Sequence, residues 1–279
     1  MFRPAGCALF AATVGVAAGI AVITSTPASA ASYYLALGDS LAHGVGASSG
    51  NGYVDDIFAF EQQTIAGLQL VNLSCSGETT STMMSGGICT YATGSQLGDA
   101  EAFLAAHPGE VAFVTIDIGG NDVAPCLLSI PVDKTCVASA LPIATANLDA
   151  ILTALRTSGG AVPIVGLTYY DPVLAYWLQG GAGQTAAHDS VTMVKSVNRA
   201  LKKSYKKHRA RVANGQQTFA TTKWALAGSY ANQIVPINVA QVCAWTLMCT
   251  MNDIHANDAG HAALAGAFEP QIAKALASP

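Results

Sequence analysis

The sequence predicts an α/β fold, a three-layer α/β/α sandwich with a central parallel sheet. Apolar runs of strand length alternate with longer segments in which apolar residues recur at helical spacing. The run at 110–118 is almost continuously apolar, which is typical of a strand buried on both faces of a parallel sheet. Parallel strands that alternate with helices are joined by right-handed crossovers, and these place helices on both faces of the sheet.

The elements of this fold can be assigned in chain order. Strand character is found at 33–38, 68–73, 110–118, 162–168 and 211–213. Helical spacing is found at 55–65, 96–107, 142–157 and 187–208. A last helix follows a cap at Asn257 or Asp258, whereas residues 219–250 give no clear pattern. Because no repeat or linker interrupts the chain after residue 30, we expect one domain over 31–279.

Residues 1–30 have the features of a secretory signal peptide. Arg3 supplies the positive start, an apolar core extends over 8–23, and a small-residue motif predicts cleavage between Ala30 and Ala31. The apolar core is short for a membrane span, although an uncleaved anchor is the alternative. We therefore expect a secreted protein, extracellular or held at the cell envelope.

Removal of the signal would leave 12 basic and 17 acidic side chains, a net charge of −5. This balance offers no basic surface for nucleic acid, so we expect no nucleic-acid partner. No later apolar run approaches the length of a membrane span, so we expect no stable membrane insertion. The remaining 249 residues are enough for one α/β domain with a large core, and we expect a monomer.

Six cysteines remain after the predicted cleavage, and an even number in an exported chain indicates disulfides. Fifteen connectivities are possible for six cysteines. We favour the sequential pairs because each lies within one local loop region: Cys75–Cys89, Cys126–Cys136 and Cys243–Cys249. A zinc site is the alternative, but the chain has no Cys-x-x-Cys pair or clustered histidine to support it. We expect no metal.

Four short blocks place reactive side chains at strand ends or in loops. They are Gly38-Asp39-Ser40-Leu41, Gly77, Gly120-Asn121-Asp122 and Asp253-Ile254-His255. Each block alone is ordinary turn or loop chemistry. In this order and spacing they resemble the four blocks of the GDSL/SGNH hydrolase superfamily, and the resemblance extends from residue 33 to about residue 270. The chain looks most like the extracellular lipases and esterases of actinobacteria within this group.

The resemblance implies a flavodoxin-like fold and ester hydrolysis without a metal or other cofactor. Ser40 would be the nucleophile and His255 the general base. The backbone N–H groups of Ser40 and Gly77 and the side-chain amide of Asn121 would form the oxyanion hole. These roles suit the residue types, because N–H donors stabilise a developing oxyanion and imidazole exchanges protons near neutral pH. A glycine at position 77 would let its N–H approach closely, since no Cβ obstructs it.

The last block departs from the family pattern, in which an aspartate stands three residues before the histidine. Asn252 occupies that position, and Asp253 lies only two residues before His255. Three interpretations remain open. Asp253 could reach the imidazole through a shifted turn, a backbone carbonyl could orient the ring instead, or Asp253 could cap the following segment.

These observations predict a secreted serine ester hydrolase, an esterase or lipase, that acts through an acyl-serine intermediate. Its partner would be a small-molecule or lipid ester. An acetyl-carbohydrate esterase is the alternative within the enzyme class. A non-catalytic binding protein of the cell envelope with the same fold is the alternative outside it, and the unusual last block is the feature in its favour.

Overall fold

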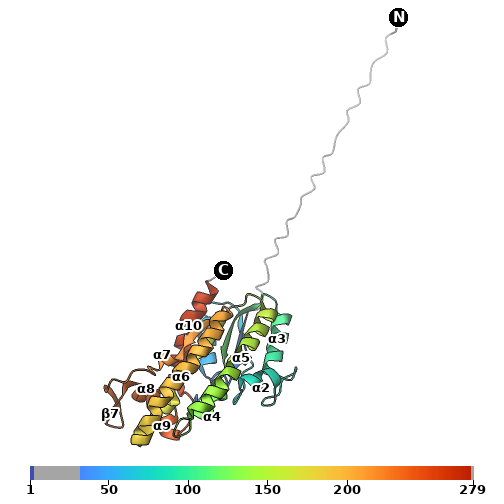
Figure 1. Ribbon diagram of the computed structural model, residues 1–279. Coiled ribbons are helices and arrows are strands. Elements are labelled where there is room, and N and C mark those ends of the chain that lie inside the picture. The colour runs from blue at the N-terminus through green and yellow to red at the C-terminus, as the bar shows by residue number, and fades with distance from the viewer. Residues whose placement is uncertain (3–31, 278–279) are drawn as a thin grey trace. The chain divides into compact units, whose positions relative to one another are not determined.

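A five-stranded parallel sheet with the strand order β2-β1-β3-β4-β5 forms the centre of the fold (Figure 1). Its strands are β1 (Ser32–Gly38), β2 (Leu68–Asn72), β3 (Val111–Asp117), β4 (Ile164–Thr168) and β5 (Arg211–Asn214). The computed structural model describes residues 1–2 and 32–277, and those from 32 onward belong to one compact unit. The predicted cleavage site and nearly all of the predicted signal peptide lie outside the described residues.

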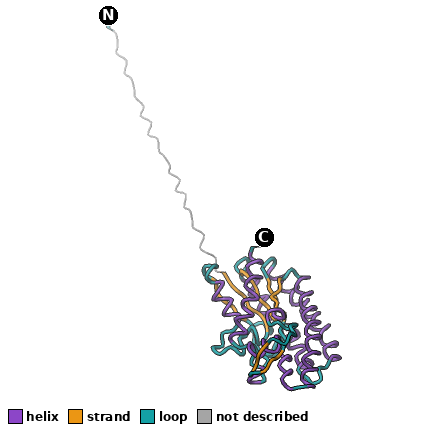
Figure 2. Tube along the Cα trace, turned by 90° about the vertical axis from the view of Figure 1, so that its left-hand side faces the viewer, coloured by secondary structure: helices purple, strands orange, loops and turns teal. Residues whose placement is uncertain are grey.

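Helices cover both faces of this sheet, which confirms the predicted three-layer α/β/α sandwich (Figures 1 and 2). One face packs against α1 (Tyr53–Glu61) and α10 (Asp258–Leu276). The other packs against α3 (Gln96–Ala106), α5 (Lys134–Gly159) and α6 (Gly181–Lys207). Strand β1 supplies both cores, because side chains alternate between the two faces of a strand. Tyr34 and Ala36 point to the first face, and Leu35 and Leu37 to the second.

The five strands lie where the sequence predicts them, within two residues at each end. Helices α5 and α6, however, begin earlier and are longer than predicted. Helix α5 begins at Lys134, because the side chain of Asp133 accepts a hydrogen bond from Cys136 N at 2.8 Å and caps the helix. The helix continues through Pro142, so the prediction that it begins at this proline was wrong. The last helix begins after Asn257, whose side chain accepts from Gly260 N.

Several short elements have no prediction because they are too short to show a period. The unassigned segment 219–250 contains a hairpin of β6 (Gly228–Tyr230) and β7 (Gln233–Val235), followed by α8 (Ile237–Trp245) and α9 (Met248–Met251). Four more elements lie in segments for which the sequence predicts no helix or strand: α2 (Thr80–Ser85), α4 (Gly120–Leu127), the 3-10 helix η1 (Pro172–Gln179) and α7 (Gly215–Thr218). These elements surround the carboxyl ends of the strands and shape the site described below.

Among the described residues, α5 is the one helix with the length and apolar composition to cross a membrane. Its inner face carries Leu148, Ile151, Leu152 and Leu155, which are fully buried in the core between the sheet, α3 and α6. The expectation that no later apolar run approaches the length of a membrane span was therefore wrong for α5. Its inner face belongs to the core, while 28 % of its apolar stretch as a whole is buried.

Candidate active site

Ser40 lies immediately beyond the carboxyl end of β1, buried to 7 % exposure. Gly38 has φ +150, and a Cβ added there would collide with the side chain of Asp117 on β3. Only glycine therefore permits β1 and β3 to end so close together. The side chain of Asp39 accepts a hydrogen bond from Leu41 N at 3.0 Å, which closes the turn that presents the Ser40 hydroxyl.

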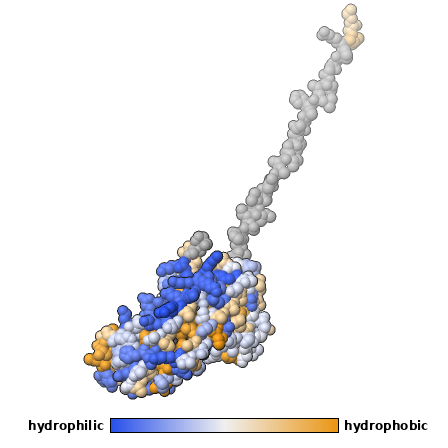
Figure 3. Space-filling model, in the orientation of Figure 1, coloured by the Kyte–Doolittle hydropathy of each residue, from blue (hydrophilic) through white to orange (hydrophobic). Residues whose placement is uncertain are grey.

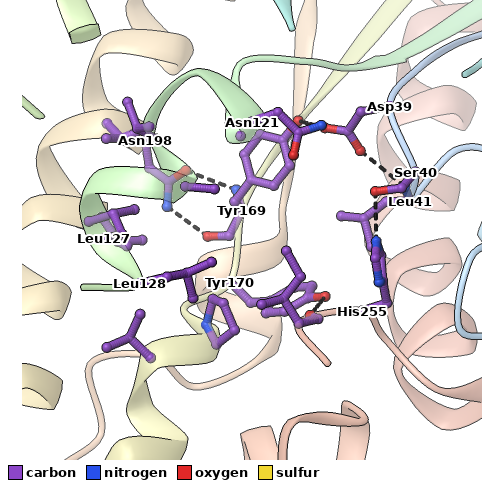
Figure 4. A pocket seen from close by; sticks show the side chains of 18 residues that line it. Asp39, Ser40, Leu41, Asn121, Leu127, Leu128, Tyr169, Tyr170, Asn198 and His255 are labelled. Carbon is purple, nitrogen blue, oxygen red and sulfur yellow. Dashed lines mark hydrogen bonds between the residues drawn. The ribbon is translucent and has the colours of Figure 1, made fainter. Parts of the chain in front are cut away.

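His255 meets this hydroxyl from the other end of the chain. The distance from His255 Nε2 to Ser40 Oγ is 2.8 Å (Figure 4). On the other side of the ring, His255 Nδ1 lies 2.5 Å from Asp253 Oδ1. An ionised carboxylate can only accept, so Nδ1 carries the ring proton and Nε2 is free to accept from Ser40. This is the arrangement by which a serine hydroxyl can be deprotonated.

Asp253 reaches the imidazole through a shifted turn, the first of the three interpretations left open by the sequence. Asn252 adopts a left-handed conformation with φ +54, and Asp253 Oδ1 then accepts from both His255 N, at 3.0 Å, and the ring. Burial acts to raise the pKa of Asp253, but these two hydrogen bonds and the attraction of the imidazole outweigh it and hold the pKa below its usual value. Asp253 is therefore a stable anion beside the ring.

Asn121 and Gly77 belong to two other segments of the chain, helix α4 and the loop after β2. Asn121 is in the first turn of α4, where it lines the same cavity as Ser40 and His255 and donates from Nδ2 to Glu78 O at 2.9 Å. The loop that carries Gly77 is joined to the end of β1 by a hydrogen bond from Cys75 N to Gly38 O at 3.1 Å.

The structure adds a reason for a glycine at position 77. A Cβ added there would meet only Ile88 Cδ1, at 4.0 Å, so the protein itself does not crowd this position. Gly77 instead has φ +87, a left-handed conformation that other residues rarely adopt. This backbone angle is therefore a further requirement for glycine at position 77, beside the expected close approach of its N–H to an oxyanion, and it turns the loop toward Asn121.

A pair of buried aspartates lies behind Ser40. The side chains of Asp39 and Asp117 interact, and Asp117 Oδ2 is a buried oxygen with no donor among the described residues. Burial raises the pKa of both carboxyls, and the charge of Asp39 raises that of Asp117 further. Asp39 also accepts from Leu41 N and Tyr169 Oη, so the shared proton belongs mainly to Asp117, which donates it to Asp39.

An apolar cavity opens beside the Ser40 hydroxyl (Figure 4). Its polar end is formed by Ser40, Asn121 and His255, and the remainder is mainly aliphatic. Three elements supply most of that apolar wall, namely α4 with Val123, Leu127 and Leu128, η1 with Val173, and α6 with Val194 and Val197. An ester whose carbonyl lay at Ser40 could extend an apolar chain into this space.

The six cysteines form the three sequential pairs that the sequence favours: Cys75–Cys89, Cys126–Cys136 and Cys243–Cys249. Each pair stabilises a loop next to one site residue. The first encloses Gly77, the second joins the end of α4 to the start of α5, and the third precedes the His255 turn. In the part of the chain that the structure describes, no group of three or more His, Cys, Asp or Glu side chains could hold a metal ion.

A family model assigns the chain to a family of known proteins. The model of the GDSL-like lipase/acylhydrolase family matches residues 36–263, a span that includes all four blocks. The chain belongs to the GDSL-like lipase/acylhydrolase family. It is thus a carboxylic ester hydrolase, as its sequence predicts. No curated protein matches the chain significantly by sequence.

Solved structures of two lipases and a phospholipase share this fold. A lipase from a goat rumen metagenome is 18 % identical with a TM-score of 0.58, over 86 % of this chain and 97 % of that one. The extracellular lipase of Streptomyces rimosus is 19 % identical with a TM-score of 0.57, over 86 % and 100 %. Phospholipase A1 of Streptomyces albidoflavus is 18 % identical with a TM-score of 0.52, over 87 % and 100 %. These similarities show the same fold.

Two parts of the GDSL site have no counterpart in the sequence analysis. The sequence contains a weak indication of the carboxyl pair, because Asp117 is a charged residue at the end of a mainly apolar strand. The apolar cavity has no signal, since its wall comes from two unpredicted elements, α4 and η1, and from one face of α6. Packing of distant elements creates a cavity, and no local pattern records it.

Proposed function

We propose that this GDSL family member hydrolyses carboxylic esters through a covalent acyl intermediate on Ser40. The single observation that carries the proposal is the continuous chain of hydrogen bonds from Ser40 Oγ to His255 Nε2 and from His255 Nδ1 to Asp253 Oδ1. The imidazole takes the serine proton as Oγ attacks the ester carbonyl carbon, and Asp253 stabilises the imidazolium that results.

The oxyanion of the tetrahedral intermediate is stabilised by three N–H donors in this proposal: Ser40 N, Gly77 N and Asn121 Nδ2. The location of Asn121 at the polar end of the cavity supports its role, and its bond to Glu78 O orients the amide. Each such donor contributes about 3 kcal/mol to transition-state stabilisation. His255 then protonates the leaving alcohol, and a water activated by His255 releases the acid from Ser40.

The apolar cavity supports a lipid-type ester with an acyl chain longer than acetyl. Its aliphatic wall begins beside the serine, so successive methylene groups of an acyl chain would leave water as they enter it. A two-domain esterase active on acetylated mannans shares the fold, at 16 % identity and a TM-score of 0.52, over 89 % of this chain and 50 % of its own. An acetyl-carbohydrate esterase is therefore the alternative function. A comparison of ester substrates must distinguish it from a lipid-type esterase.

A series of p-nitrophenyl esters from acetyl to palmitoyl, together with acetylated xylan, tests the proposal on the wild type and on Ser40→Ala. We expect kcat/KM to rise beyond acetyl and Ser40→Ala to be inactive on every ester. Val194→Phe would fill the cavity and move the optimum to shorter chains. Val191→Phe, on the same helix and buried outside the cavity, is the matched control for overpacking. Full activity of Ser40→Ala would disprove the acyl-serine mechanism.

We also propose that the chain is exported as one hydrolase domain over residues 31–279. Three disulfides support an oxidising destination. Expression with residues 1–30 intact should yield extracellular protein whose first residue is Ala31, as read by N-terminal sequencing. Retention of the full chain in the cell membrane would instead indicate an uncleaved anchor.

A further inference from the structure

One segment of the surface is almost without charge. Residues 212–252 contain a single charged side chain, that of Lys223, whereas the whole chain has 13 basic and 17 acidic residues. The segment folds into α7, the β6–β7 hairpin, α8 and α9, and it ends directly before the Asp253–His255 turn.

The same segment exposes the most accessible aliphatic side chains between residues 32 and 277. Ile234 is 77 % exposed, Met251 70 % and Leu226 66 %. We call these three residues the apolar patch. Ile234 is on the outer face of the hairpin opposite Ser229, while its neighbour Val235 is buried against α8. Figure 3 shows hydrophobic surface at the left edge, where Figure 1 places β7.

The inner side of this segment supports the site. Leu247 N donates to His255 O at 2.9 Å, and Thr246 pairs with Ala256, so the α8–α9 connection holds the His255 turn. Helix α8 and the hairpin also pack against Trp177 of η1, and η1 forms one wall of the apolar cavity. The segment that carries the apolar patch therefore also holds the His255 turn and packs against the element that forms one wall of the cavity.

We infer that the apolar patch docks on the surface of aggregated, uncharged lipid, so that the enzyme takes its ester substrate directly from an emulsion or membrane. The inference rests on the proposed function, because the molecule that enters the cavity is then a component of the surface beneath the patch. Exposed aliphatic side chains insert into the headgroup and acyl boundary of lipid, and burial of their apolar area supplies the affinity. With one charged residue in the segment, anionic headgroups gain little from it.

The test compares binding with turnover. Leu226→Ser/Ile234→Ser removes two patch residues and leaves Met251 beside the His255 turn unchanged. Ile143→Ser/Leu276→Ser, two exposed aliphatic side chains on α5 and α10, is the matched control. Binding to triolein emulsions stabilised with phosphatidylcholine is measured by flotation in the inactive Ser40→Ala background. Turnover of soluble p-nitrophenyl butyrate is measured with Ser40 present, and melting temperatures confirm folding.

We expect the patch variant to bind the emulsion about tenfold more weakly, because lipid affinity scales with buried apolar area. The control variant should bind within twofold of wild type, both variants should hydrolyse the soluble ester within twofold, and added salt should not weaken binding. Equal binding of the patch variant and wild type would overturn the inference, as would wild-type binding to insoluble acetylated xylan in place of the emulsion. Failure of wild type to hydrolyse the soluble ester would instead refute the proposed function.

Discussion

The two halves of the candidate site are supported in different ways. Ser40 follows a buried strand, and its neighbour Asp39 is held by Leu41, Tyr169 and Asp117 at almost no exposure. His255 belongs to a partly exposed turn after a disulfide-closed loop, and its Asp253 has a side chain that is 37 % exposed. The aspartate on the strand has a raised pKa, and the aspartate on the turn has a lowered one.

This difference shows how one site can keep one carboxylate charged and another carboxyl protonated. Burial without enough donors raises the pKa of the Asp39–Asp117 pair, so the pair keeps a proton and carries a single negative charge. Asp253 has water on one side and two donors from His255 on the other, so it stays ionised. The charge that must face the imidazolium is thus supplied by the exposed half of the site.

The largest expected effect comes from removal of the contact between the two halves. Ser40→Ala and His255→Ala should each lower kcat by about 10⁵-fold or more, as in other serine hydrolases. The double variant should lose no more than either single variant, because the two residues act as one unit. Steady-state kinetics on a short ester measure this, and additive losses would contradict the hydrogen-bonded pair.

Asp253→Asn tests the exposed half alone. We expect kcat to fall by about 10⁴-fold, since an amide no longer holds the imidazole in the tautomer that accepts from Ser40. Asp258→Asn is the matched control, because this exposed carboxylate is three residues after His255 and accepts its hydrogen bonds from Ser48, away from the imidazole. A loss below tenfold for Asp253→Asn would mean that another group orients the ring.

Removal of the Cys243–Cys249 disulfide tests whether the exposed half depends on its loop. Cys243→Ala/Cys249→Ala should lower the unfolding free energy by about 2 kcal/mol, from the entropy of a short closed loop. We expect kcat/KM to fall about tenfold as well, because the loop positions Leu247 against His255 and a small displacement weakens proton transfer. Denaturant unfolding and ester kinetics measure the two effects, and an unchanged kcat/KM would show that the turn is self-supporting.

The smallest effect on activity is expected in the buried half. Asp117→Asn keeps a neutral donor toward Asp39, so kcat/KM should stay within about twofold. Stability should respond to pH, because the native pair retains a proton that the unfolded chain has released above the usual carboxyl pKa of 3.8. Wild type therefore loses stability as the pH rises above that value, by up to about 1.4 kcal/mol per unit until the pair ionises.

The variant should lose this pH dependence. The difference between its melting temperature and that of wild type should therefore shift in favour of the variant as the pH rises from 5 to 8. Parallel curves, or a large loss of activity in Asp117→Asn, would show that Asp117 is ionised in the native protein. The groups that face the pair are Tyr53, Tyr169 and His255, so Tyr53→Phe is the control for a lost hydrogen bond without a change in charge.

Local sequence patterns were sufficient for the parts of the fold that depend on neighbours along the chain. The five strands, the cysteine pairs and the strand-end turn at Ser40 follow from short stretches, and the structure contains each of them. The hairpin, α8 and α9 were missed because strands of three residues and helices of nine and four residues are too short to show a clear period. The position of Asp253 was left open because it depends on the left-handed backbone of Asn252.

The sequence by itself determined the family blocks and the alternation of strands and helices. Each block and each element consists of residues that are close together in the chain. Only the tertiary structure decided that Asp39 faces Asp117, that three separate elements enclose an apolar cavity, and that the least charged segment lies behind His255. Each of these depends on strand order and helix packing, in which residues far apart in sequence come into contact. Such contacts are set by the energy of the whole fold, which no short stretch of the chain contains.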